Sequence, residues 1–196
     1  RCIPNTLIMA PSDEQECNSM LYTGYLHNGP AIVRYPRGEG LGVEVKNNFK
    51  NLDIGHSKKI KDGEKISILS FGSILDICKN VADELNASLV DMRFVKPIDR
   101  EIVINHAKKF SLIVTVEDNA IKGGAGSLVN EIIIEENIEN ISIINIGAPD
   151  KFFSHATREE QLELSGISEK EILRKIKDFV KNNNLYDLNL SSNIKL

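Results

Sequence analysis

The segment from Ser111 to Ile134 constrains the fold of this chain more than any other. It opens with an apolar, β-branched run from Leu112 to Val116, which is typical of a strand buried on both faces of a parallel sheet. A glycine cluster follows at positions 123 to 126, and a helix is expected to begin near Ser127. A strand, a tight turn and a helix in this order predict an open α/β sheet with this strand near its middle.

The glycine cluster has two interpretations. In open α/β sheets ligands bind beyond the carboxyl ends of the strands, so these glycines could cradle a phosphate where the helix begins. A dinucleotide fingerprint, however, needs a third glycine where Val129 stands, and a phosphate loop needs a Gly-Lys-Ser/Thr sequence. We therefore favour a sharp turn that packs the helix or forms an interface. A structural role is also favoured for the neighbouring Glu117 and Asp118, because no histidine accompanies them.

Apolar strands and amphipathic helices alternate from Lys65 to Ile146 in the same way, which predicts a mainly parallel, doubly wound sheet. Strands are expected at 66–71, 89–92, 111–116 and 141–146, a loop at 93–99, and helices at 74–85, 98–109 and 127–136. Two more helices should follow, with capping boxes formed by Thr157 with Glu160 and by Ser168 with Glu171. The expected core consists of Ile68, Phe71, Ile77, Val81, Leu89, Ile113, Val114, Val129 and Ile143.

A smaller strand–helix–strand unit is predicted ahead of this alternation. Its strands are expected at 6–9 and 31–35, and its helix at 13–25, with Ser12 and Gln15 forming a capping box. The apolar face of that helix should hold Cys17, Met20, Leu21 and Tyr25.

The unit at 1–45 carries too little apolar surface to fold alone, so it is expected to be the end of a larger α/β domain. A glycine-punctuated linker should follow at 46–62, then the main domain at 63–182 and a polar tail at 183–196. Because the chain starts at Arg1 without an initiator methionine or a signal peptide, we expect it to be a fragment.

Charge and cysteine content narrow the class of partner. The chain of 196 residues has a formal net charge of −4 with acids and bases interspersed, which argues against nucleic-acid binding. No apolar run approaches the roughly 20 residues that span a membrane. Cys2, Cys17 and Cys78 are far apart and odd in number, which favours a reducing compartment. The histidines show no ligand spacing with cysteines or acids, so no metal site is expected.

The most suggestive polar group is Arg34-Tyr35-Pro36-Arg37-Gly38, because it follows a strand whose carboxyl end should face the ligand crevice. The planar fork of arginine matches phosphate geometry, and Pro36 with Gly38 would stiffen the turn. A surface or interdomain ion pair explains these arginines equally well. For Arg93 and Lys96, at the end of another strand, an interface ion pair is favoured over anion binding, because no base or nucleophile is near them.

In five segments the chain resembles the 1-deoxy-D-xylulose-5-phosphate synthase family. The segments are PSDEQECNSMLYTGY (11–25), VRYPRG (33–38), DMRFVKPID (91–99), TVEDNAIKGGAGS (115–127) and NIGAPDKFF (145–153). The resemblance implies a transketolase-type transferase that uses thiamine diphosphate and Mg²⁺. Such an enzyme condenses pyruvate with glyceraldehyde 3-phosphate, releases carbon dioxide, and feeds non-mevalonate isoprenoid, thiamine and pyridoxal synthesis.

The resemblance also implies roles for parts of this chain. Arg37 matches the arginine that contacts the phosphate of the aldehyde substrate in this family, whereas Arg34 gains no such support. Residues 1–45 would end the pyrimidine-binding domain, and 63–182 would be the non-catalytic C-terminal domain that packs a homodimer. Thiamine diphosphate and Mg²⁺ would be bound upstream of Arg1, with no catalytic or metal-binding residue in this chain. The implied location is the bacterial cytoplasm, or a plastid-type organelle in a eukaryote.

Two alternatives remain open at this point. Another transketolase-type enzyme, such as a pyruvate dehydrogenase β subunit, would share the architecture without needing an arginine for a sugar phosphate. A non-catalytic α/β interaction module would share the fold alone.

Overall fold

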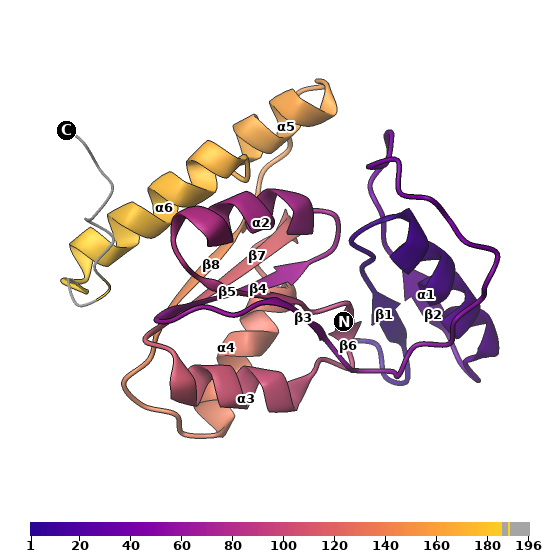
Figure 1. The fold of residues 1–196 in the computed structure, drawn as a ribbon, viewed down its shortest axis with the longest axis horizontal. Coiled ribbons are helices and arrows are strands. Elements are labelled where there is room, and N and C mark those ends of the chain that lie inside the picture. The colour runs from indigo at the N-terminus through magenta and orange to yellow at the C-terminus, as the bar shows by residue number, and fades with distance from the viewer. Residues whose placement is uncertain (186–187, 189–196) are drawn as a thin grey trace.

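The computed structural model describes residues 1–185 and residue 188, and it contains two sheets (Figure 1). The larger sheet has the order β3-β5-β4-β7-β8. Its strands are β3 (Lys58–Lys61), β4 (Ile66–Phe71), β5 (Ser88–Asp91), β7 (Leu112–Ala120) and β8 (Ser142–Ala148). Four of them are parallel, and β3 alone pairs antiparallel at the edge. We call this sheet with its helices the main domain.

Helices cover both faces of the larger sheet (Figure 1). One face carries α2 (Leu75–Glu84) and α6 (Glu169–Asn182), and the other carries α3 (Arg100–Lys109) and α4 (Ala125–Glu135). The short helix α5 (Arg158–Ser165) precedes α6. The doubly wound, mainly parallel α/β fold expected from the sequence is therefore confirmed.

The centre of the larger sheet is buried on both faces. Every residue of β4 is buried, and Val114 of β7 lies between Ile68 of β4 and Ile144 of β8 in the register. Because the strands are covered on both sides, they read as continuous apolar runs rather than as alternating ones. The expected core residues are all buried except Ile77 and Ile143, which are partly buried.

A second, three-stranded sheet joins the N-terminal unit to the main domain. This unit consists of β1 (Leu7–Met9), α1 (Glu14–Leu26) and β2 (Ala31–Val33), with β1 and β2 parallel. The third strand is β6 (Phe94–Lys96), which pairs antiparallel with β1. The expectation of a loop at 93–99 was therefore wrong. A strand of three residues is too short to show periodicity, and its pairing partner lies far away in the sequence.

The range expected to be a linker also contains a strand. Lys58 to Lys61 form β3, which extends the larger sheet along β5. Its lysine-rich sequence hid the strand from apolar patterning, and lysines are typical of an exposed sheet edge. The remainder of the range runs along α1, where the Lys46 N–H donates to Gln15 Oε1 at 2.8 Å. The division of the chain into domains stays a prediction.

Three expectations about the helix ends were not met. Asp13, not Ser12, is the N-cap of α1, and its carboxylate accepts from the Glu16 N–H at 2.8 Å. Ser168 precedes α6 but forms no capping hydrogen bond. The helix after the glycine cluster begins at Ala125, two residues before the expected start. The capping box of Thr157 with Glu160 is confirmed.

The outer face of α1 differs from the expected apolar face. Met20 is buried and Cys17 is partly exposed, but Leu21 is 53% and Tyr25 84% exposed. The sequence pattern shows which side chains are apolar, whereas only the neighbouring elements decide which of them are covered. Among the described residues, no helix is both long enough and apolar enough to cross a bilayer. The expected tail at 183–196 lies largely outside the described residues.

Val114→Asp should unfold the main domain. An unpaired carboxylate between β4 and β8 costs several kcal/mol, and the whole stability of a domain is only about 5–15 kcal/mol. Thermal unfolding followed by circular dichroism measures the effect. Ile134→Asp is the matched control, because Ile134 is 75% exposed on α4 and should tolerate the charge. A Val114→Asp chain that melts with the parent would remove β7 from the core.

Candidate functional site

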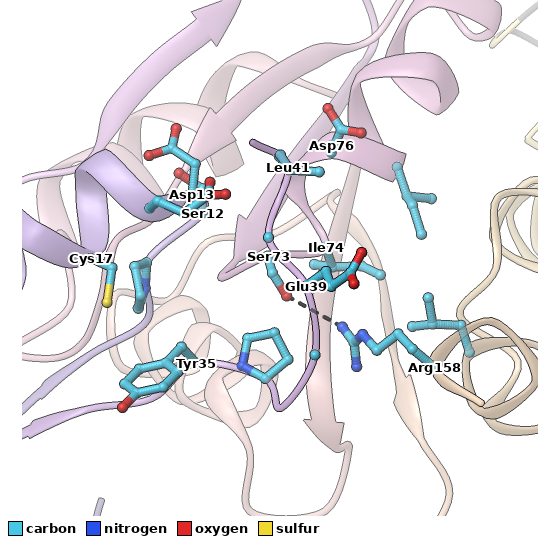
Figure 2. Close-up of a pocket in the computed structure, with 17 residues that line it drawn as sticks. Ser12, Asp13, Cys17, Tyr35, Glu39, Leu41, Ser73, Ile74, Asp76 and Arg158 are labelled. Carbon is cyan, nitrogen blue, oxygen red and sulfur yellow. Dashed lines mark hydrogen bonds between the residues drawn. The ribbon is translucent and has the colours of Figure 1, made fainter. Parts of the chain in front are cut away.

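A cleft of about 340 Å³ separates the start of α1 from the start of α2 (Figure 2). The segment that follows β2 runs across it, and the first residue of α5, Arg158, closes one side. The walls are mainly apolar, with Tyr35, Leu41 and Ile74 among them. Four carboxylates also line the cleft, from Asp13, Glu14, Glu39 and Asp76, against the single guanidinium of Arg158. This excess of negative charge is unfavourable for a phosphate ligand.

Arg37 lies beside this cleft but does not point into it. Pro36 and Gly38 line the cleft, whereas the side chain of Arg37 does not and is exposed. Within the part of the chain that the structure describes, no hydrogen bond or ion pair engages its guanidinium. The fork of Arg37 is therefore open to an anion from outside these residues.

Arg34 behaves differently from Arg37, although both come from the same turn. The Arg34 side chain is partly buried, and its Nη1 donates to the backbone carbonyl of Asp118 at 2.7 Å. Asp118 belongs to β7, so this bond connects the N-terminal unit to the main domain. The ion pair left open for these arginines is not formed by Arg34 among the described residues, because its partner is a backbone carbonyl rather than a carboxylate.

The side chain of Asp118 is bound by other segments of the main domain. Its Oδ2 accepts from Nη2 of Arg158 at 2.6 Å. The same Nη2 donates to the hydroxyl of Ser73 at 3.3 Å (Figure 2). Ser73 stands in the turn between β4 and α2. The polar group therefore joins the N-terminal unit, the end of β7, the start of α5 and the β4–α2 turn. Sequence reasoning missed Ser73 and Arg158, because no local pattern marks a contact between such distant segments.

The glycine cluster is a packing turn, as favoured from the sequence. Glu117 is 1% exposed, and its carboxylate accepts from the backbone N–H groups of Ala125 at 2.8 Å and Gly126 at 2.9 Å. This carboxylate thus occupies the N-terminus of α4, where a phosphate would otherwise be favoured. A Cβ at Gly124 would overlap the carboxylate oxygens, so the close approach requires glycine there.

The interface ion pair favoured for Arg93 is observed, whereas Lys96 makes interface hydrogen bonds to backbone carbonyls and forms no ion pair among the described residues. Nη2 of Arg93 lies 2.6 Å from Oε1 of Glu16, with side-chain exposures of 16% and 12%. Nζ of Lys96 donates to the carbonyls of Arg1 at 2.9 Å and Ile3 at 2.5 Å. Both side chains therefore bind the main domain to the N-terminal unit.

Asp91 is a buried acid at this joint that sequence reasoning did not single out. It ends β5, is 1% exposed, and accepts from the Arg93 N–H at 3.1 Å through Oδ1. Among the described residues Oδ2 has no hydrogen-bond partner. Burial raises the pKa of Asp91 to about 6, and the hydrogen bond from Ser12 offsets only part of that shift. An acid at the end of an apolar strand was the available signal.

The turn formed by the glycine cluster does not fit a magnesium–diphosphate group. Glu117 already occupies the N-terminus of α4, which is the helix end that the glycine cluster precedes. In the range 1–185 and at 188, no three His, Cys, Asp or Glu side chains converge as metal ligands.

Comparison with known proteins identifies the family. A family model described as the transketolase C-terminal domain matches residues 55–172, more than half of the chain. The chain belongs to the transketolase C-terminal domain family. Two related transketolase structures share the fold. One is named "Split gene transketolase, inactive beta4 tetramer" and has a TM-score of 0.77 and 26% identity over 91% of this chain and 59% of that one.

The other structure is transketolase from Campylobacter jejuni, with a TM-score of 0.59 and 16% identity over 91% of this chain and 27% of that one. At that identity the likeness shows the fold alone. Both structural matches cover 91% of this transketolase-family chain, so they extend across the N-terminal unit as well as the main domain.

Two curated relatives of this transketolase-family chain carry the same name. A 1-deoxy-D-xylulose-5-phosphate synthase of Psychromonas ingrahamii is 49% identical over 178 residues, which cover 88% of this chain and 28% of that protein. One from Vibrio atlanticus is 47% identical over 186 residues, covering 92% of this chain and 30% of that protein. The chain thus spans less than a third of the length of these relatives.

Glu117→Gln should lower the free energy of unfolding by about 1.5–3 kcal/mol, because one of two charge-assisted bonds to the N-terminus of α4 is replaced by an amide facing an N–H donor. Urea unfolding followed by circular dichroism measures the loss. Glu139→Gln is the matched control at an exposed glutamate and should cost less than about 0.5 kcal/mol. Equal stabilities of the two variants would contradict the capping role of Glu117.

Asp91 should make stability depend on pH. Its folded pKa of about 6 lies above the unfolded value of about 3.9, so its contribution is fully present below about pH 4 and is lost as pH rises through 6. The shift of roughly two pKa units corresponds to about 3 kcal/mol. The side chain introduced by Asp91→Asn cannot ionise, so this variant should not lose stability between pH 4 and pH 7 through this position. Unfolding free energies at pH 4 and pH 7 test it, and parallel pH profiles for parent and variant would contradict it.

Proposed function

We propose that this chain is part of a 1-deoxy-D-xylulose-5-phosphate synthase, which condenses pyruvate with glyceraldehyde 3-phosphate and releases carbon dioxide. The names of relatives that are 47–49% identical over about 90% of the chain support this assignment. Because the chain spans less than a third of those proteins, the activity belongs to a longer enzyme. We place that enzyme in the bacterial cytoplasm, where it feeds isoprenoid, thiamine and pyridoxal synthesis.

The observation that carries the proposal is the free guanidinium of Arg37. Arg37 follows β2 at the carboxyl end of a parallel pair, where ligands bind in α/β sheets. Its exposed fork can form two parallel hydrogen bonds with phosphate oxygens. We assign Arg37 to the phosphate of glyceraldehyde 3-phosphate. This role also favours a sugar-phosphate enzyme over a pyruvate dehydrogenase β subunit, which handles no such substrate.

We propose that the rest of the enzyme, upstream of Arg1, binds thiamine diphosphate and Mg²⁺. One observation supports placing the cofactor site outside this chain. The N-terminus of α4, which could otherwise bind a diphosphate, is already capped by Glu117. The contribution of this chain is then Arg37 and a rigid frame for it. The catalytic residues are likewise assigned to the upstream part.

We further propose that the complete enzyme is a homodimer in which the main domain packs between subunits. The related structure named as an inactive β4 tetramer of a split-gene transketolase supports self-association of such chains. Its name also agrees with a fragment that has no activity alone. A non-catalytic interaction module would instead leave the complete protein without activity on either substrate.

Arg37→Ala in the full-length enzyme should raise KM for glyceraldehyde 3-phosphate far more than KM for pyruvate, because pyruvate has no phosphate. Losing a charge-assisted pair costs about 1.5–3 kcal/mol, or roughly ten- to a hundredfold in kcat/KM. Arg37→Lys should restore only part of this, since a point charge cannot reproduce the planar fork. Steady-state kinetics with each substrate varied in turn measures the effect.

Two controls sharpen the Arg37 experiment. Turnover of non-phosphorylated glyceraldehyde should be nearly indifferent to Arg37→Ala. Arg174→Ala removes an exposed arginine of α6, paired with Glu171 and Asp178, and should leave both KM values unchanged. Equal losses with phosphorylated and non-phosphorylated aldehydes would make Arg37 a structural residue and remove the support for the proposed substrate.

A further inference from the structure

The joint at which α1 meets the end of β5 contains buried polar atoms without hydrogen-bond partners. Among the described residues these include Oδ2 of Asp91, Oε2 of Glu16 and Nε of Arg93. Buried polar atoms are normally hydrogen-bonded, so unpaired ones gathered at one place call for an explanation. We propose that Asp91 and Glu16 compete for the guanidinium of Arg93, and that uptake of one proton by Asp91 closes the joint between the N-terminal unit and the main domain.

The structure shows the arrangement in which Glu16 holds Arg93. Nη2 of Arg93 lies 2.6 Å from Oε1 of Glu16, so the main domain binds α1 of the N-terminal unit. Asp91 precedes Arg93 by two residues, and its Oδ1 accepts from the Arg93 N–H at 3.1 Å. A rotation of the Arg93 side chain would let its unpaired Nε donate to the unpaired Oδ2 of Asp91. Arg93 would then exchange a partner in the N-terminal unit for a partner in the main domain.

The charges at the joint make a proton the missing partner. Arg93 and Glu16 are only 16% and 12% exposed, so an ionised Asp91 would add a second carboxylate to one shielded guanidinium. Lys58 of β3 is the register partner of Asp91 and its Nζ lies 3.8 Å from Oε1 of Glu16, but this side chain is 52% exposed and screened by water. Burial, with a smaller contribution from Glu16, raises the pKa of Asp91 to about 6, and the hydroxyl of Ser12 lowers it only in part.

The groups that β4 and α2 contribute beside Asp91 are uncharged. Ser70 of β4 is the register partner of Asp91 on this side, and its hydroxyl lies beside the thiol of Cys78 on α2. Burial raises the pKa of Cys78 to about 12, so the thiol stays neutral near pH 6. The proton at the joint therefore belongs to Asp91.

The backbone of Arg93 opposes the closed arrangement. Its φ is +56°, and the Phe94 N–H donates to the Met92 carbonyl across it. Tight turns of this kind with a positive φ are rare and strained, and such strain is typical of switch regions. The Arg93 carbonyl also accepts from the Ala10 N–H of the N-terminal unit at 2.8 Å. Contacts with that unit thus hold the strained turn, and release of Glu16 would let it relax.

Hydrogen–deuterium exchange of the full-length protein tests the proposal at pH 5 and pH 7, on either side of the Asp91 pKa of about 6. Exchange times are scaled for the intrinsic pH dependence of amide exchange, and mass spectrometry reads the peptides. With a pKa of about 3.9 for Asp91 in the open joint, the opening constant should rise about tenfold between these pH values. The open joint stays a minor state, which exchange detects. Peptides from α1 should lose protection at pH 7, whereas those from α6, away from the N-terminal unit, should not (Figure 1).

Two variants assign the effect to the competing carboxylates. Asp91→Asn keeps the size of the side chain but cannot ionise, so α1 should stay protected at both pH values. Glu16→Gln weakens the bond that holds α1 and leaves Arg93 to Asp91. In that variant α1 should already be as poorly protected at pH 5 as the parent is at pH 7. This second variant keeps the test decisive if Asp91→Asn fails to fold.

Asp83→Asn is the matched control. Asp83 belongs to α2, is 68% exposed and pairs with Lys61, so its loss should leave the tenfold change in α1 intact. Equal pH dependence of α1 in Asp91→Asn and Asp83→Asn would overturn the proposal, as would a parent protein without any pH dependence there. Equal losses of protection in α1 and α6 would show a loosening of the whole chain instead of the joint. Parent-like protection of α1 at pH 5 in Glu16→Gln would show that Arg93 does not hold the joint.

Discussion

The structure depends on the burial of β4 and β7 on both faces. Two adjacent parallel strands whose side chains are mostly apolar cannot be stable with either face in water, so helices must cover both. The helices α2 and α6 on one side and α3 and α4 on the other meet this requirement. Parallel strands end at the same edge, and that edge therefore gathers the polar residues of several segments, including Ser73, Asp91 and Glu117.

At that edge, the buried carboxylate of Glu117 decides what the glycine cluster can do. A helix N-terminus attracts an anion, and here the chain supplies its own. The site of a dinucleotide or phosphate-loop protein is thus closed from within, and the turn becomes a rigid support for the next residue, Asp118. Because Glu117 occupies this helix end, we assign no ligand to the glycine-rich turn.

The joint between the two sheets is built from charged groups that are largely withdrawn from water. Arg93 pairs with Glu16, and Asp91 lies nearby with a pKa of about 6 and one oxygen without a partner among the described residues. Removing charges from water costs free energy that pairing only partly offsets. The pair of Arg93 with Glu16 therefore fixes the geometry of the joint more than it adds to stability. Against this fixed joint, the turn after β2 separates one anchored arginine, Arg34, from one free arginine, Arg37.

The sequence by itself determined the fold class, the order of most strands and helices, and most of the core, because apolar periodicity shows which faces of strands and helices need to be covered. It also marked Arg37 and Glu117, through the chemistry of a strand end and a glycine turn. Only the tertiary structure decided the pairings of β3 and β6, the exposed face of α1, and the contacts of Arg34 with Asp118 and of Arg158 with Ser73. These features join segments that are distant in the chain, and a local pattern carries no information about which distant segment will supply the partner.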